Sequence, residues 1–270
     1  MPDFPSPLPF SVIVTTLRAA GCVFAEDEAE LILSTAGTPA ELAAMVDRRA
    51  AGLPLEHVLG WAEFRGLRIA MDPGVFVPRR RTEFLVDQAV GLVSRADGPA
   101  VVVDLCCGSG ALGAALAAAL GRVELHACDV EPAAVRCARR NVAGAGEVYE
   151  GDLFEPLPAS LRGRVGILLA NVPYVPSGDV ELLPAEARIH EPRVALDGGG
   201  DGLDVLRRVT AEAPRWLAPG GHLLVETSER QAARAEETVA RSGLTARVVT
   251  SDELYATVVI GTQPGTATGR

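Results

Sequence analysis

The sequence predicts an α/β protein with a doubly wound, mostly parallel sheet and a small helical region before it. Three observations support this prediction. From residue 100 onward, short apolar runs alternate with amphipathic segments, as strands do when crossover helices join them. The last two apolar runs, 246–250 and 256–260, are too close for a helical crossover, so they should pair antiparallel at the edge of the sheet. Residues 11–60 carry a helical pattern instead.

These patterns divide the chain into three parts: a helical region at residues 1–62, a hairpin and linker at 63–98, and the α/β domain at 99–270. In the first part, Thr38-Pro39-Ala40-Glu41 has the form of a capping box with proline at the first helical position. In the second part, residues 67–77 alternate weakly around the turn sequence Asp72-Pro73-Gly74, which predicts a hairpin there.

The third part contains the expected strands and helices in order. The strands should be 101–105, 123–128, 148–150, 165–171, 221–226, 246–250 and 256–260. The helices should be 111–120, 132–141, 203–217 and 230–242.

A glycine-rich loop follows the first of these strands. Gly108-x-Gly110-x-x-Gly113 permits a tight turn and close approach of a ligand to the backbone amides. Asp129 ends the second strand, 21 residues after Gly108, where a carboxylate can accept hydrogen bonds from both ribose hydroxyls. A dinucleotide and S-adenosylmethionine both suit this pattern, and Asp129 also suits the N-cap of the next helix.

Two further carboxylates favour S-adenosylmethionine. Asp104 precedes the glycines, where it can attract a cofactor ammonium but would repel a pyrophosphate. Asp152 follows the third strand and can accept from an adenine amino group, while Leu153 or Phe154 packs on the ring. Asp152 is otherwise an ordinary turn residue.

Asn171-Val172-Pro173-Tyr174 follows the apolar run 165–170 and should lie at the carboxyl end of a buried strand. A carboxamide, backbone carbonyls beside a rigid proline and an aromatic face form a clamp for a planar NH2-bearing group. An ordinary proline-containing turn is the alternative for the tetrapeptide alone. Together with the glycine loop, it predicts an amino-group methyltransferase.

Charge and composition limit the partners. The net charge is −10, and the chain contains no lysine, which argues against duplex DNA as the substrate. Arg79-Arg80-Arg81 is a local basic cluster, which fits either a solvated surface turn or a contact with an acidic partner.

No apolar segment approaches the length of a membrane span, and residues 1–10 lack the pattern of a secretory signal, so we expect a cytoplasmic protein. We expect no metal site, because the five cysteines lack paired metal spacing and mostly fall in apolar segments, as buried free thiols do. We expect structural roles for the four histidines.

The sequence resembles a known family over nearly its whole length. The motifs that carry the resemblance, in order, are 54–60 (Pro-Leu-Glu-His-Val-Leu-Gly), 62–66 (Ala-Glu-Phe-Arg-Gly), Pro78-Arg79-x-x-Thr82-Glu83, 191–199 (Glu-Pro-Arg-x-Ala-Leu-Asp-Gly-Gly) and Asp201-Gly202-Leu203. They resemble the HemK/PrmC family of protein-glutamine methyltransferases. Enzymes of that family use S-adenosylmethionine to methylate a side-chain amide in class I peptide-chain release factors.

The resemblance implies roles for individual residues. Asp104, Gly108, Gly110, Asp129 and Asp152 would bind the cofactor, with backbone contacts from Cys106. Asn171 and Tyr174 would hold the acceptor amide, with its hydrogens donated to the Asn171 oxygen and the Val172 carbonyl. The partner would be a release factor, with no membrane and no nucleic acid involved.

The sequence also departs from the family. Val172 stands where the family has proline, Cys106 replaces a glycine, and Arg80 and Arg81 replace a proline and an acidic residue. Position 172 contributes only a carbonyl, so the clamp should survive. Three alternatives therefore stay open: another protein as acceptor, an exocyclic amine of a nucleic acid, and an NAD-dependent or non-catalytic protein.

Overall fold

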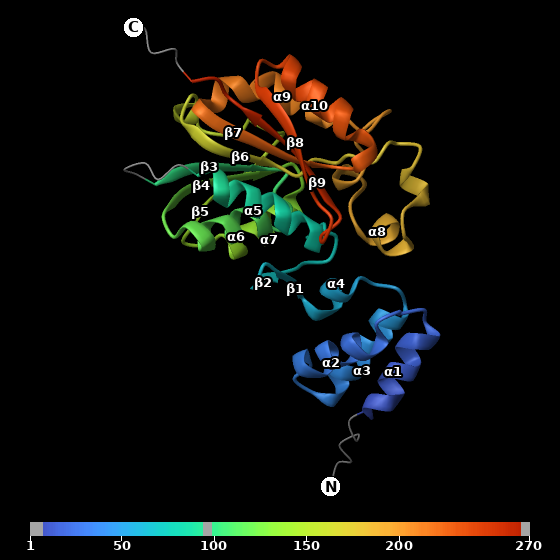
Figure 1. The fold of residues 1–270 in the computed structure, drawn as a ribbon. Helices are drawn as coiled ribbons and strands as arrows, with labels where there is room; N and C mark the ends of the chain where they lie inside the picture. The colour runs from blue at the N-terminus through green and yellow to red at the C-terminus, as the bar shows by residue number, and fades with distance from the viewer. Residues whose placement is uncertain (1–7, 94–98, 266–270) are drawn as a thin grey trace, which may run out of the picture.

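The computed structural model describes residues 8–93 and 99–265, so the predicted boundary at residue 98 and the outer ends of the first and last parts lie outside the described residues. The first helices form a group beside the sheet domain (Figure 1). They are α1 (Phe10–Ala19), α2 (Ala25–Thr35), α3 (Pro39–Ala50) and α4 (Leu55–Leu59).

These four helices share a cluster of buried side chains, which includes Ile13, Leu17, Ile32, Leu42 and Met45. The predicted capping box is only partly present: the Thr38 hydroxyl accepts a hydrogen bond from the Glu41 amide at 3.1 Å, whereas the Glu41 carboxylate accepts from the Gly37 amide at 2.8 Å and not from the Thr38 amide. The local sequence therefore fixes where α3 begins.

The predicted position of the hairpin is wrong. The hairpin consists of β1 (Trp61–Phe64) and β2 (Leu67–Ala70), paired antiparallel through the two residues Arg65 and Gly66. Both turn residues have positive φ, 52° and 74°, as the tight hairpin turns that match strand twist require. Residues 72–74 form a separate turn after β2.

The predicted linker also contains a helix that the sequence analysis did not predict. A short 3-10 turn, η1 (Arg80–Thr82), leads into α5 (Glu83–Leu92). The buried residues of this helix are Leu85, Val86 and Ala89. Their spacing places them on one helix face, and this apolar pattern was already visible in the sequence.

The main sheet confirms the predicted fold class. Its order is β5-β4-β3-β6-β7-β9-β8. Strands β3 to β7 are parallel, β9 runs antiparallel to β7, and the last two strands pair antiparallel as predicted, with β9 between β7 and the edge strand β8. The bounds are β3 (Ala100–Leu105), β4 (Val123–Asp129), β5 (Gly146–Glu150), β6 (Val165–Ala170), β7 (Leu217–Thr227), β8 (Thr245–Ser251) and β9 (Ala256–Thr262).

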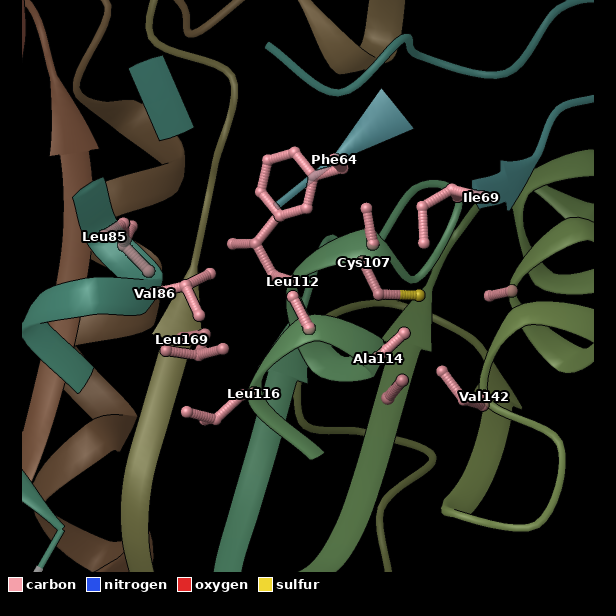
Figure 2. Close-up of a cluster of buried hydrophobic side chains, with 14 of the residues drawn as sticks. Phe64, Ile69, Leu85, Val86, Cys107, Leu112, Ala114, Leu116, Val142 and Leu169 are labelled. Carbon is pink, nitrogen blue, oxygen red and sulfur yellow. The ribbon is translucent and has the colours of Figure 1, made fainter. Parts of the chain in front are cut away.

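Helices cover both faces of this sheet (Figure 1). One buried cluster lies beneath α5, α6 (Ala111–Leu120) and α7 (Pro132–Asn141), and a second lies beneath α9 (Asp204–Trp216) and α10 (Ala232–Arg241). Figure 2 shows the first cluster, in which Phe64 of β1 lies beside Leu112 of α6. The hairpin is thereby packed onto the beginning of α6.

The strand order reverses between β3 and β6, which are parallel neighbours. Leu105 at the end of β3 is in register with Ala170 at the end of β6. The glycine loop and the 171–174 segment therefore leave the sheet side by side, at the edge where doubly wound sheets bind ligands. None of the helices in the described ranges is long and apolar enough to cross a membrane.

Candidate functional site

A cavity of about 480 Å³ lies at the carboxyl ends of the parallel strands. Its wall includes all the predicted site residues except Asp104 and Gly110: Cys106, Gly108, Asp129, Asp152, Leu153, Asn171, Val172, Pro173 and Tyr174. Segments that are far apart in the sequence thus meet at one cavity.

Asp129 binds the glycine loop beside this cavity through its carboxylate. One oxygen of its carboxylate accepts from the Gly108 amide at 2.8 Å, and the other accepts from the Glu131 amide at 2.9 Å. A β-carbon placed on Gly108 would meet nothing within 4 Å, so space for a ligand lies directly over this backbone. Burial raises the pKa of Asp129 above its usual value, partly opposed by these amide hydrogen bonds.

Asp104 and Gly110 lie beneath the loop and not on the cavity wall. Asp104 is 1% exposed, and its Oδ2 accepts from the Gly113 amide at 3.0 Å. Its Oδ1 is buried with no partner among the described residues, and burial raises its pKa to about 7. Gly110 packs α6 against α7, because a β-carbon there would lie 3.1 Å from the Ala138 side chain.

The segment after β5 provides another part of the wall. The Asp152 carboxylate accepts from the Arg208 guanidinium of α9 at 2.5 Å, and both residues line the cavity. Leu153 also lines it, whereas Phe154 stacks on Trp216 in the core, with ring centroids 5.3 Å apart. Leu153 therefore remains the predicted ring contact, and Phe154 does not line the cavity.

The 171–174 segment places one amide and one phenol at the cavity. The Asn171 side chain is half-buried and has no hydrogen-bond partner among the described side chains or backbone groups. The Tyr174 hydroxyl donates to Glu226 at 3.0 Å and accepts from Arg81 at 2.7 Å. Burial and the neighbouring Glu226 raise the pKa of Tyr174 to about 12.

A second glycine-rich segment, residues 195–199, packs against the 171–174 segment and hydrogen-bonds to the residue that follows it. The Val175 amide donates to the Leu196 carbonyl at 3.1 Å, and the Gly198 amide donates to the Val175 carbonyl at 2.8 Å. A β-carbon on Gly198 would lie 2.6 Å from the Pro173 carbonyl oxygen. We did not predict this support, although the motif at 195–199 was visible in the sequence.

The outer half of the cavity is built from three other parts of the chain. Glu56 of α4, Arg79 before α5 and Glu186 of α8 (Ala185–His190) all line it. Ion pairs hold two of these residues: Arg79 pairs with Glu191 at 2.6 Å, and Glu186 pairs with Arg49 of α3 at 2.6 Å. The helical region therefore forms part of the cavity mouth.

Residues 79–81 are not a simple solvated turn, because two of the three arginines are ion-paired with buried carboxylates, although Arg81 keeps 45% of its side chain exposed. Arg79 and Arg81 are paired with the buried carboxylates Glu191 and Glu226, and only Arg80 is an exposed arginine off the cavity wall. The four histidines, all within the described residues, lie off the cavity wall, and all five cysteines are free thiols.

Comparison with known proteins gives three matches of interest. A model of the methyltransferase small domain matches residues 66–203. The release factor glutamine methyltransferase of Geobacter sulfurreducens is 41% identical over 211 residues, covering 76% of this chain and 72% of that protein. The 4-amino-L-phenylalanine/4-methylamino-L-phenylalanine methyltransferase of Streptomyces pristinaespiralis is 38% identical over 193 residues, covering 70% and 65%.

Among solved structures, a methyltransferase from Pyrococcus furiosus superimposes with a TM-score of 0.52. It is 16% identical, and the match covers 82% of this chain and 98% of that one. At this identity the likeness concerns the fold alone.

Proposed function

We propose that this protein methylates the side-chain amide nitrogen of a glutamine in a peptide-chain release factor, because the chain belongs to the HemK/PrmC family of glutamine methyltransferases. The chain is an S-adenosylmethionine-dependent methyltransferase. The observation that carries the proposal is the free Asn171 carboxamide, which shares one cavity with the glycine loop.

The inner half of the cavity fits the cofactor. When bound, S-adenosylmethionine supplies a methyl group on a positively charged sulfur. Asp129 would take the ribose hydroxyls, and the backbone at Cys106 and Gly108 would take the amino acid part. Asp152 and Leu153 would hold the adenine.

The position of Asp104 also supports binding of the cofactor at this site. Its partnerless oxygen Oδ1 is buried under the glycine loop, where a cationic group bound above would compensate the buried acceptor. Gly110 supports this arrangement indirectly, by letting α6 and α7 approach closely.

The acceptor amide needs orientation more than it needs a base. Its nitrogen is a weak nucleophile because the lone pair is delocalised, so the site must fix the nitrogen and stabilise the charge that develops on it. The Asn171 oxygen and the Val172 carbonyl would accept its two hydrogens, with Pro173 making the segment rigid and Tyr174 packing on the amide. After transfer, a proton can leave to water.

The helical region, residues 1–62, is proposed to recognise the acceptor protein. Pro54 and Glu56 reach the cavity mouth, while the rest of the region has its own buried cluster. A folded acceptor could therefore contact this region while its glutamine enters the cavity.

The test is to incubate the protein with labelled S-adenosylmethionine in four separate reactions, which contain release factors, total protein, RNA or 4-amino-phenylalanine. Label on a glutamine of a release factor is the expected result. Label on RNA or the free amino acid alone would contradict the proposal, and label on a different protein would keep the chemistry but reject the acceptor.

A further inference from the structure

The segment that follows β5 is anchored to helix α9 at both of its ends. Oδ2 of Asp152 accepts from Nη2 of Arg208 at 2.5 Å. At the other end of the segment, the Phe154 ring stacks on Trp216, with ring centroids 5.3 Å apart. Leu153 lies between these anchors and has a φ of 49°, a left-handed conformation that is rare for residues other than glycine. Such backbone strain persists only where surrounding contacts hold it, and it clusters at ligand sites.

Arg208 reaches the cavity from α9. Val205 and Arg208 lie one turn apart on the same face of this helix, and both line the cavity. Asp152 and Leu153 line it as well. The side chains of Arg208 and Asp152 are 55% and 41% exposed. An ion pair with this exposure adds little to the free energy of unfolding, so we expect its effect in ligand binding.

The ion pair leaves half of the Asp152 carboxylate free. Each of the two carboxylate oxygens can accept hydrogen bonds. Oδ2 is taken by Arg208, whereas Oδ1 has no hydrogen-bond partner among the residues that the structure describes. A side chain that is already held by one oxygen loses less rotational freedom when a ligand binds the other, so the ligand binds more tightly. Arg208 thus prepares Asp152 as an acceptor.

We infer that Arg208 is a positioning residue of the cofactor site, which holds the Asp152 carboxylate so that its free oxygen accepts from the amino group of the adenine. The inference rests on the proposed function, in which Asp152 and Leu153 hold the adenine. Arg208 acts through Asp152 and needs no contact with the cofactor. Recognition of the adenine amino group therefore depends on a side chain of α9, 56 positions further along the chain.

Calorimetry with two ligands tests the inference. One ligand is S-adenosylhomocysteine, and the other is its analogue in which hydrogen replaces the amino group of the adenine. Their binding would be measured for the parent, Arg208→Gln, Asp152→Ala and Arg215→Gln. Arg215→Gln is the matched control, because Arg215 is an exposed arginine of the same helix, pairs with Glu212 at 2.9 Å and lies off the cavity wall. Arg208→Lys keeps the charge and is the second variant, in case Arg208→Gln does not fold.

The parent should bind S-adenosylhomocysteine roughly tenfold or more tightly than the analogue, because the analogue leaves the carboxylate oxygen unpaired. Arg208→Gln should weaken binding of S-adenosylhomocysteine roughly three- to tenfold and leave binding of the analogue nearly unchanged. Arg208→Lys should show a smaller loss of the same kind, because lysine lacks the rigid fork of arginine. Asp152→Ala should bind both ligands about equally, and Arg215→Gln should behave as the parent does.

A purely structural role of Arg208 would weaken the binding of both ligands by the same factor, and this result would overturn the inference. Equal binding of the two ligands by the parent would also overturn it, as would a preference of parental size in Arg208→Gln or Asp152→Ala. A loss of preference in Arg215→Gln as large as in Arg208→Gln would assign the effect to the charge of α9 as a whole, against the inference.

Methyl transfer to a release factor is scored separately with the parent. If no glutamine is labelled, the proposed function is contradicted, while the two ligand affinities still decide the role of Arg208. If glutamine is labelled but the parent binds both ligands equally, the proposed function is supported and the inference is overturned.

Discussion

Asp104 is a carboxylate that the fold holds away from solvent, with one oxygen bound to the Gly113 amide and one without a partner among the described residues. Burial raises its pKa to about 7, so the folded state holds its proton more tightly than the unfolded state. The stability that this proton provides is fully present below pH 4 and is lost as pH rises toward about 7.

Asp104→Asn should therefore stabilise the ligand-free protein at pH 8 by about 1–3 kcal/mol, and by much less at pH 4. The measurement is urea unfolding of parent and variant across this range. The same variant should bind S-adenosylmethionine more weakly at pH 8, because it lacks the anion. A stability difference that does not change with pH would contradict the assigned ionisation.

Asn171→Ala should separate binding from chemistry. The loss of one amide-orienting acceptor should lower kcat on the order of 100-fold, with cofactor affinity nearly unchanged. Single-turnover kinetics and calorimetry would measure the two effects. Val172→Pro is the control and should keep its activity, because the acceptor at position 172 is a backbone carbonyl. Equal turnover in Asn171→Ala and the parent would rule out the clamp.

At the scale of elements, the segment 195–199 positions the clamp through backbone contacts. Gly198→Ala would push a methyl group toward the Pro173 carbonyl oxygen, now 2.6 Å from the ideal β-carbon, and should cost about 1–3 kcal/mol of stability and most of the turnover. Gly200→Ala is the matched control, since nothing lies within 4 Å of its added carbon. Thermal unfolding and methyl transfer would check both; equal behaviour of the two variants would contradict this support.

The sequence predicted the strands of the α/β domain and its helices α6, α7, α9 and α10 because their apolar periodicity is local, but it missed α8 (Ala185–His190), which has no buried residue. The hairpin was misplaced because Asp72-Pro73-Gly74 is a conventional turn sequence, whereas the actual turn relies on Arg65 with positive φ, which arginine rarely adopts. The pairs Arg81–Glu226 and Arg79–Glu191 join residues more than 100 positions apart. No local pattern reports such contacts, so this half of the site required the structure.

For the whole molecule, the contact between the helical region and α8 shapes the cavity mouth. None of the residues of α8 is buried, and Arg49 reaches Glu186 of this helix from a buried position beside Glu28. An ion pair between distant parts of the chain therefore lies at the cavity mouth.

Glu186→Gln should lower kcat/KM for a folded release factor roughly 3- to 10-fold and leave cofactor affinity unchanged. Stability should change by less than about 1 kcal/mol, because Glu186 is 48% exposed. Glu181→Gln is the control, since its 3.5 Å ion pair with Arg188 is local to this segment and lies off the cavity wall. Equal kinetics for both variants would show that the Arg49 contact does not shape the mouth.

The central claim is that this cavity methylates the side-chain nitrogen of a glutamine. Tandem mass spectrometry of a release factor incubated with the protein and isotopically labelled S-adenosylmethionine tests it most directly, with Asn171→Ala as the paired reaction. We predict one labelled methyl group on the side-chain amide of a glutamine, strongly reduced in the variant. A labelled methyl on any other atom of the release factor, or equal labelling by both proteins, would contradict the account.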